Sequence, residues 1–163
     1  MNSPKSSVLL AQLEALYQQV DAALQGWTCQ ASTLCCRFGI TGREPYVTSI
    51  ELALIERQLA SRGGGLPTRR RALPLARDTV EQFGQRWRKE ERTCPLLDSS
   101  GRCFVYACRP FGCRTFFCDN SLKSKHISRE RIRQWVAEIE RLAHHYCPDG
   151  DKGRPLTRAL RVG

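Results

Sequence analysis

The side chains with the clearest chemistry are four cysteines placed at every fifth position, Cys103, Cys108, Cys113 and Cys118. A step of five residues turns about 140° on an α-helix and changes face on a β-strand, so neither element gathers these thiols. An irregular backbone around a metal ion or a metal cluster can gather them, and Pro110 and Gly112 favour such a backbone. The spacing therefore predicts a metal site.

Other cysteines that could join this site lie far away in the sequence, at Cys29, Cys35, Cys36 and Cys94. Eight thiols are enough for two four-thiolate sites, each of which could hold tetrahedral zinc or a [4Fe–4S] cluster. One such site with spare or catalytic cysteines fits the same sequence. We predict as metal ligands Cys29, Cys35, Cys36, Cys94, Cys103, Cys108, Cys113 and Cys118.

The spacing within the cysteine blocks bears on the identity of the metal. Zinc sites usually contain pairs of cysteines separated by two to four residues, whereas here five, none, eight and four residues separate neighbours within the blocks. Iron–sulfur clusters accept more varied loops, and the aromatic residues among the cysteines could exclude water from a cluster or simply belong to the core. An iron–sulfur cluster, with [4Fe–4S] favoured, and Zn²⁺ both remain open.

Weaker site candidates lie beside the cysteines and near the end of the chain. Arg109 and Arg114 each follow a predicted ligand, and an outward ion pair is favoured over the binding of an anionic substrate. His144, His145 and Cys147 end a predicted helix, where polar groups suit the free carbonyls, so they are interpreted as structural. No Ser-His-Asp order, paired-carboxylate motif or H-E-x-x-H helix stands out. No catalytic residue is predicted, and whether the chain is an enzyme stays open.

Composition and charge indicate the number of domains, the cellular compartment and the kind of partner. The 163 residues, 41% hydrophobic and 26% charged, fit one globular domain. An apolar run of only four residues, from Val8 to Ala11, predicts neither a signal peptide nor a membrane span. We therefore expect a cytoplasmic protein, in which thiols stay reduced and bind metal. The net charge of +10 permits an acidic partner, whether nucleic acid, anionic lipid or a charged protein surface, and nucleic acid is not favoured.

Four helices are expected to position the cysteines. Apolar residues at steps of three and four predict a helix over residues 5–25, and a capping-box pattern at Thr48 starts a second helix that stops at glycines 63–65. A third helix is expected over residues 74–91 and a fourth from Ser128 to Pro148. These helices would bring the two cysteine blocks together.

The expected fold is mainly α-helical, a small domain with irregular cysteine-rich metal-binding loops. The domain is predicted to span residues 1–148, and residues 149–163 are predicted to form a basic, loosely held tail. Because no regular element orders residues 103–118, removal of the metal is expected to unfold at least this segment.

The motifs carry a resemblance to a known family. The pattern Cys29-x2-Ser32-x2-Cys35-Cys36, followed by Cys94-Pro-Leu-Leu, Cys103-Phe-Val-Tyr106 and Arg109-Pro-Phe-Gly-Cys113-Arg114, resembles the YkgJ-type cysteine-cluster family, which is described as a zinc- or iron-chelating domain. The resemblance implies ligand roles for Cys29, Cys35, Cys36, Cys94, Cys103 and Cys113. Ser32 stands where the family has its second cysteine, and Cys108 and Cys118 lie outside the commonest pattern and could restore the lost ligand.

The favoured function is metal binding through cysteine thiolates, with a redox or cluster-handling role. Flagellin lysine N-methylases contain a similar cysteine cluster, so a cluster-dependent protein-modifying enzyme is an alternative. No glycine-rich fingerprint follows a strand here, which weakens that alternative. A zinc-stabilised module that binds nucleic acid or protein is a second alternative, supported by the net charge and by arginines 69–71.

Overall fold

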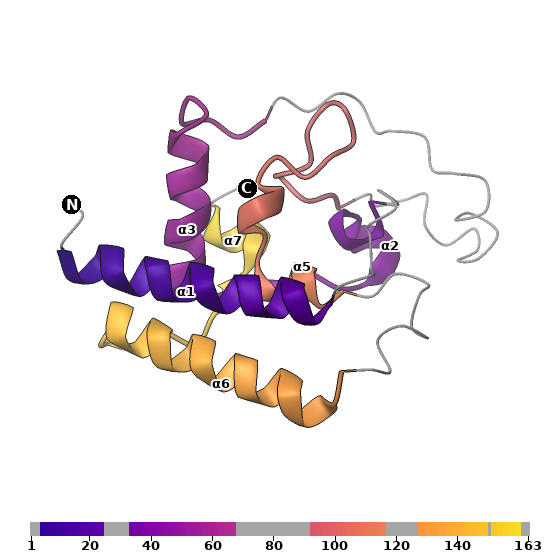
Figure 1. Cartoon of the computed structure of the whole chain (residues 1–163). Coiled ribbons are helices and arrows are strands. Elements are labelled where there is room, and N and C mark those ends of the chain that lie inside the picture. Colours follow the sequence, from indigo (N-terminus) through magenta and orange to yellow (C-terminus); the bar gives the residue numbers. More distant parts are fainter. Residues whose placement is uncertain (1–3, 25–32, 68–91, 117–126, 150, 161–163) are drawn as a thin grey trace.

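The computed structural model describes residues 4–24, 33–67, 92–116, 127–149 and 151–160 (Figure 1). Its larger helices are α1 (Pro4–Ala23), α3 (Ser49–Ala60) and α6 (Arg129–Tyr146). The shorter elements are η1 (Leu34–Cys36), α2 (Phe38–Thr41), β1 (Tyr46–Val47), η3 (Tyr106–Cys108), α5 (Phe111–Arg114), β2 (Arg154–Pro155) and α7 (Leu156–Ala159). The mainly helical fold predicted from the sequence is confirmed.

Some predicted features lie outside the described residues. They are the third helix over 74–91, arginines 69–71, Ser32, and two of the predicted ligands, Cys29 and Cys118. In the part of the chain that is described, no helix has both the length and the apolar character needed to cross a bilayer.

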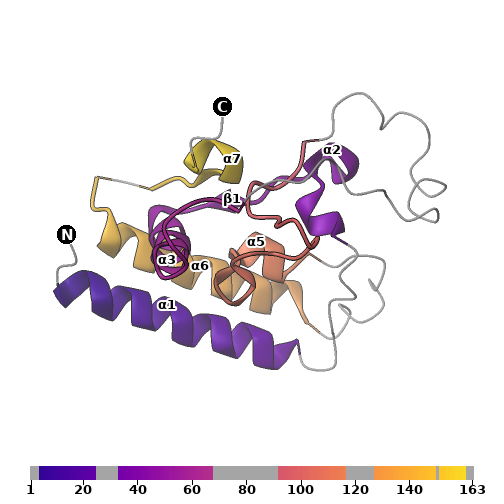
Figure 2. The ribbon, with the colours of Figure 1, turned by 90° about the horizontal axis from the view of Figure 1, so that it is seen from above.

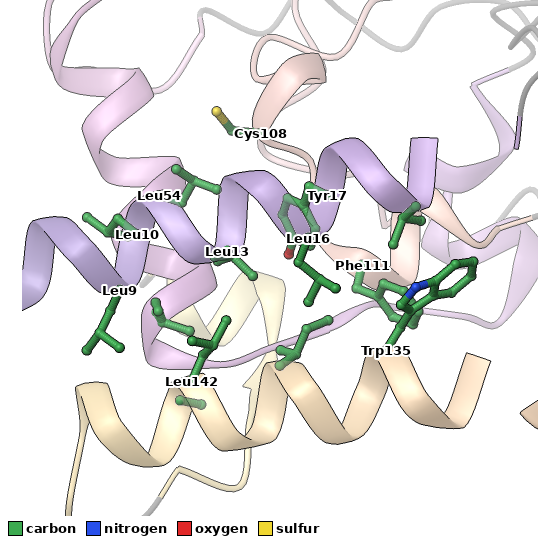
Figure 3. Close-up of a cluster of buried hydrophobic side chains, with 14 of the residues drawn as sticks. Leu9, Leu10, Leu13, Leu16, Tyr17, Leu54, Cys108, Phe111, Trp135 and Leu142 are labelled. Atoms are coloured by element: carbon green, nitrogen blue, oxygen red, sulfur yellow. The ribbon is translucent and has the colours of Figure 1, made fainter. Parts of the chain in front are cut away.

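Helices α1 and α6 lie side by side and run in opposite directions, and α3 crosses them (Figures 1 and 2). The three helices bury one apolar cluster between them, to which α1 contributes Leu13 and Val20, α3 contributes Ile50, and α6 contributes Ile139 and Leu142 (Figure 3). The apolar residues of α1 and α6 recur at steps of three and four, so each helix presents one stripe to the others. The apolar face of each helix therefore lies in the shared core.

The starts of α3 and α6 follow from their capping residues. Thr48 accepts a hydrogen bond from the N–H of Glu51, whose carboxylate in turn accepts one from the N–H of Thr48, which completes a capping box. Ser128 accepts a hydrogen bond from the N–H of Arg131 at 3.1 Å and starts α6. Both helix starts are at the predicted positions.

Residues 151–160 pack against the rest of the fold, whereas a loosely held tail was predicted over residues 149–163. Strand β2 pairs antiparallel with β1, with Tyr46 opposite Pro155. The N–H of Leu156 donates to the carbonyl of Pro45 at 3.0 Å, and the side chain of Leu156 is only 1% exposed. Leu156 belongs to a second apolar cluster, which also contains Phe38, Val47, Ile55 and Leu96. This buried leucine anchors the segment, because its burial removes a large apolar surface from water.

A network of buried polar side chains ties the cysteine segment to α1 and α3. Arg114 is 1% exposed, and its guanidinium pairs with Asp21 and lies 4.0 Å from the ring centroid of Tyr17. The hydroxyl of Tyr17 donates to Glu51 at 2.6 Å, and the N–H of Phe111 donates to the same carboxylate oxygen at 3.0 Å. Buried charges are stable only when they are paired and hydrogen-bonded, as these are. The network therefore fixes the position of α5.

Arg114 also holds the backbone of the cysteine segment directly. Its Nε donates to the carbonyl of Arg109 at 3.0 Å, and another guanidinium nitrogen donates to the carbonyl of Ala107. Burial and the nearby charge of Glu51 raise the pKa of Tyr17 well above its usual value, so its hydroxyl remains a donor at neutral pH.

We expect Arg114→Met to lower the free energy of unfolding by about 2–4 kcal/mol, because it leaves carbonyls and Asp21 without their buried donor. Urea unfolding followed by circular dichroism measures this change. Arg141→Met, which removes an exposed arginine paired with Glu138, is the control and should hardly change the midpoint. Equal midpoints for the two variants would contradict the proposed importance of Arg114.

Candidate metal centre

Five of the predicted ligands meet at one place in the structure. They are Cys35, Cys36, Cys94, Cys103 and Cys113, hereafter the thiol group. The sulfurs of Cys35 and Cys36, which are neighbours in η1, lie 3.7 Å apart. Each of the other three comes from a different segment of the chain, so the group depends on how these segments are joined.

Backbone pairing joins the first two segments. The N–H of Cys94 donates to the carbonyl of Cys36 at 2.7 Å, and Arg37 and Thr93 form an antiparallel bridge beside it. Cys36 and Cys94 are both buried in the second apolar cluster. Two cysteines that are 58 positions apart in the sequence are thereby held next to each other.

After Cys94 the chain reverses its direction, which brings Cys103 back to the thiol group. The reversal is organised by the carboxylate of Asp98, which accepts hydrogen bonds from the N–H groups of Ser100 and Arg102 at 2.8 and 2.9 Å. After it, Cys103 forms an antiparallel bridge with Leu97. An aspartate that binds nearby N–H groups is a common way to fix a tight turn.

The fifth thiol, Cys113, is supplied by α5. Arg114, the next residue, anchors this short helix from the side of α1. On another side of α5, Gly112 approaches Pro45 so closely that a Cβ at position 112 would lie 3.1 Å from the Cβ of Pro45. The small residue before Cys113 thus allows α5 to pack against the segment that precedes β1.

The thiols of the group influence one another's protonation. The hydrogen bond with Cys36, burial and the charge of Cys36 raise the pKa of Cys35 well above its usual value. Burial raises the pKa of Cys103 to about 11, and the charge of Cys35 adds to this shift. Burial, followed by the charges of Cys35 and Cys103, also raises the pKa of Cys113. The group therefore resists holding several negative charges when no cation is bound.

The pKa of Cys36 depends on thiols from both cysteine blocks. Its hydrogen bond with Cys35 lowers its pKa, but the hydrogen bond with Cys94, burial, and the charges of Cys94 and Cys103 outweigh this effect. The pKa of Cys36 is therefore raised as well. Cys36 thus connects the thiols of the first cysteine block with those of the second.

Arg109 supplies a positive charge beside the thiol group. Its charge opposes the upward pKa shifts of Cys35, Cys103 and Cys113. Its guanidinium also pairs with Asp21 at 3.1 Å and lies 4.1 Å from the ring centroid of Tyr106. The ion pairs predicted for Arg109 and Arg114 are present but are not outward, because the two arginine side chains are only 13% and 1% exposed. The side chain of Arg109 also offsets part of the charge of ionised thiols.

Cys108, also a predicted ligand, lies apart from the thiol group. It belongs to the apolar cluster formed by α1, α3 and α6, and Figure 3 shows it at the edge of this cluster. Its sulfur is 3.7 Å from the side-chain oxygen of Gln58 in α3. Burial, and then the charge of Glu14, raise its pKa, and no cysteine of the group is among the causes. The regular spacing of the cysteines therefore does not place all of them together.

The donor set of the thiol group suits a metal centre, although its present arrangement is open. Thiolates are the preferred ligands of structural zinc and of iron–sulfur clusters. Among the described residues, no three or more His, Cys, Asp or Glu side chains are arranged to hold one metal ion as they stand. The donors are therefore of the right kind, and closing the ligand set requires their side chains to turn or another ligand to join.

The positioning residues Tyr17, Asp21 and Glu51 were not identified as such from the sequence. Glu51 was assigned to a capping box, which is confirmed, but its second oxygen also binds Tyr17 and Phe111. Asp21 is 88 and 93 positions away from its two arginine partners. The one sequence feature that hinted at such contacts was the presence of Arg109 and Arg114 beside the cysteines.

No protein-family model matches this chain, and neither a curated protein nor a solved structure was found to be similar to it. The resemblance to the YkgJ-type family therefore stays a prediction that depends on the cysteine motifs. The function has to be argued from the thiol group and its surroundings.

The shift of Cys103 predicts how stability depends on pH in the reduced, metal-free protein. Its pKa in the fold, about 11, exceeds the unfolded value of 9.0. The contribution of its protonated form to stability is therefore complete below pH 9 and is lost as the pH rises toward 11. We expect Cys103→Ser to lessen the decline over this range by up to about 1.4 kcal/mol per pH unit, as measured by urea unfolding at each pH.

A cysteine outside the thiol group provides the control for this measurement. Cys147 caps the C-terminal end of α6, and Cys147→Ser serves as the comparison substitution outside the group. If Cys103→Ser and the unchanged protein lose stability at the same rate in this range, the raised pKa of Cys103 is contradicted.

Proposed function

We propose that the thiol group binds a metal centre through cysteine thiolates. The observation that carries this proposal is the meeting of five thiols from four segments, held by backbone pairing and by the anchored helix α5. Buried cysteines scattered through a core would pack as single small apolar residues. Five of them at one place are better explained by a shared ligand.

The electrostatics of the group support a cation as this ligand. Burial and neighbouring thiols raise the pKa values of Cys35, Cys36, Cys103 and Cys113, so the metal-free group favours the neutral thiols. A bound cation reverses this preference, because it attracts thiolates and displaces their protons. Binding should therefore release protons, and affinity should increase with pH. The positive charge of Arg109 acts in the same direction as the metal.

The occupant that we propose is an iron–sulfur cluster or Zn²⁺. Two thiolates on one tetrahedral zinc ion, each about 2.3 Å from it, are about 3.8 Å apart. The distance of 3.7 Å between the sulfurs of Cys35 and Cys36 is compatible with this, and is also ordinary for two thiols in contact. A [4Fe–4S] cluster would use four of the thiols and supply electron transfer or cluster handling. The metal content distinguishes these two occupants.

The placement of the cysteines also supports the proposed kinship with the YkgJ-type family. Of the six positions that the resemblance assigns as ligands, five form the thiol group and the sixth, Cys29, lies outside the described residues. Cys108, which is outside the commonest family pattern, is the cysteine that faces a different cluster. Motif and structure thus favour the same subset of thiols.

The proposal also includes the cellular compartment of the protein and the kind of partner that it binds. The five cysteines of the thiol group and Cys108 are free, which suits a reducing compartment such as the cytoplasm. The net charge of +10 suits an acidic partner, and a protein surface is favoured over nucleic acid.

Single substitutions test which thiols bind the metal. Cys35→Ser, Cys94→Ser and Cys113→Ser should each lower the metal bound per chain severalfold, because each removes one thiolate of the group. Cys108→Ser is the matched control and should keep the metal, since its thiol contacts Gln58 instead. The measurement is the content of iron, zinc and acid-labile sulfide, together with the ultraviolet–visible spectrum. The protein is purified without oxygen from cells supplied with both metals.

Each result has a definite meaning for the proposal. Iron and sulfide in equal amounts identify an iron–sulfur cluster, and colourless protein with zinc identifies a zinc site. Metal-free protein, or metal that survives all three group substitutions, contradicts the proposed centre. Loss of metal from Cys108→Ser alone would contradict the assignment of ligands.

Removal of the metal should affect two parts of the cysteine segment differently. The N–H of Phe111 donates to buried Glu51, whereas Cys94 and Phe104 are held by short backbone pairs beside the thiols. After chelation under reducing conditions, we expect faster hydrogen exchange at Cys94 and Phe104 and little change at Phe111. Unchanged exchange at all three amides would show that the metal does not stabilise the fold.

A further inference from the structure

A pocket that opens to solvent lies against the thiol group. Its volume is about 580 Å³, which is within the usual range for sites that bind small molecules. Cys35 and Cys113 line it, whereas Cys36, Cys94 and Cys103 do not. A molecule in this pocket would therefore lie next to two of the five thiols. The rest of the wall determines which kind of molecule fits.

The charged residues of the wall favour an anion. Arg43 and Arg92 line the pocket, and within the described residues neither guanidinium is paired with a carboxylate. Glu44 is the one carboxylate among the described lining residues. It already accepts hydrogen bonds from the N–H and the hydroxyl of Thr157 at 2.7 and 2.6 Å. Two guanidiniums thus remain to bind a negative group, which they can do with several N–H donors each.

The uncharged part of the wall favours a flat apolar group. Phe38, Tyr46 and Phe116 line the pocket together with Pro45. The side chain of Tyr46 is 65% exposed, although most large apolar side chains of the described chain are buried. An aromatic ring placed against Tyr46 would cover this surface and gain the usual stabilisation of ring contacts.

The wall is also held in place before any ligand arrives. Residues 44–47 are fixed by the pairing of β1 with β2 and by the bonds between Glu44 and Thr157. The close approach of Gly112 to Pro45 fixes α5 against the same segment. A pocket whose walls are already ordered loses less entropy when it binds a ligand.

We propose that this pocket binds a small organic anion with an aromatic part and holds it against Cys35 and Cys113. Arg43 and Arg92 bind the anionic group, and the ring lies against Tyr46. This function goes beyond metal binding and does not require it, because none of the groups that recognise the anion is a proposed metal ligand. The anionic group is a carboxylate or a phosphate ester, since guanidiniums bind both.

Binding of three small probes tests the proposal on the full chain. Benzoate and phenyl phosphate carry the ring and the charge, and benzyl alcohol carries the ring alone. We expect saturable shifts of the amide signals of Gly42, Tyr46 and Gly112 in nuclear magnetic resonance spectra with one or both anions. Benzyl alcohol should cause no saturable shift. Binding of benzoate alone identifies a carboxylate site, and binding of phenyl phosphate alone identifies a phosphate-ester site.

Substitution of the arginines separates recognition from chance contact. Arg43→Gln and Arg92→Gln should each weaken binding of the anion roughly tenfold, as expected for the loss of one charged hydrogen-bonding partner. Arg129→Gln, which removes an exposed arginine at the start of α6, is the matched control and should bind normally. Amide spectra that are otherwise unchanged establish that the variants fold.

Several outcomes would overturn the proposal. They are the absence of saturable shifts with both anions, equal binding of benzyl alcohol, and undiminished binding after both arginines are replaced. The same titrations on metal-free protein keep this proposal separate from the metal centre. If the protein never acquires metal but still binds the anion, the metal centre is contradicted and the pocket is not. Metal content that depends on the thiol group, without anion binding, counts against the pocket alone.

Discussion

The arrangement of the cysteine segment depends on one buried guanidinium. Arg114 connects α5 to α1 through its contacts with Asp21 and Tyr17. The hydroxyl of Tyr17 in turn donates a hydrogen bond to Glu51 of α3. A buried charge of this kind is costly unless all its donors are used, so the positions of its partners are closely restricted. Cys113 directly precedes Arg114 in the chain. The constraint that stabilises the helical core therefore also fixes where a thiol of the proposed metal centre lies.

Cysteines that are evenly spaced in the sequence have different surroundings in the fold. Cys103 and Cys113 belong to the thiol group, whereas Cys108 between them faces the cluster of α1, α3 and α6. An odd step along a non-helical chain tends to place successive side chains on opposite sides, and the short helix η3 and Pro110 interrupt any regular path. The same segment thus contributes to two cores, one beside the thiol group and one between the long helices.

The long helices could be predicted from the sequence because their determinants are local. Apolar periodicity marked α1 and α6, and capping residues marked the starts of α3 and α6. The C-terminal segment was missed because β2 has two residues and α7 has four, too few to show a period. Its position depends on burial of Leu156, which is a tertiary effect. The roles of Asp21 and Arg114 are likewise tertiary, since the two residues are 93 positions apart. Which cysteines meet could not be derived from spacing, because spacing does not specify the direction of a side chain.

The attachment of β2 and α7 to the wall beside the thiols has a consequence for the order of synthesis. A ribosome makes all nine cysteines before it makes residues 151–157. Until those residues emerge, Glu44 lacks the donors of Thr157 and β1 lacks its partner strand. The nascent chain would then carry its thiols before the wall beside them is complete, while domains generally fold as units during translation. Docking of residues 151–157 therefore completes the wall of the pocket that lies beside the thiol group.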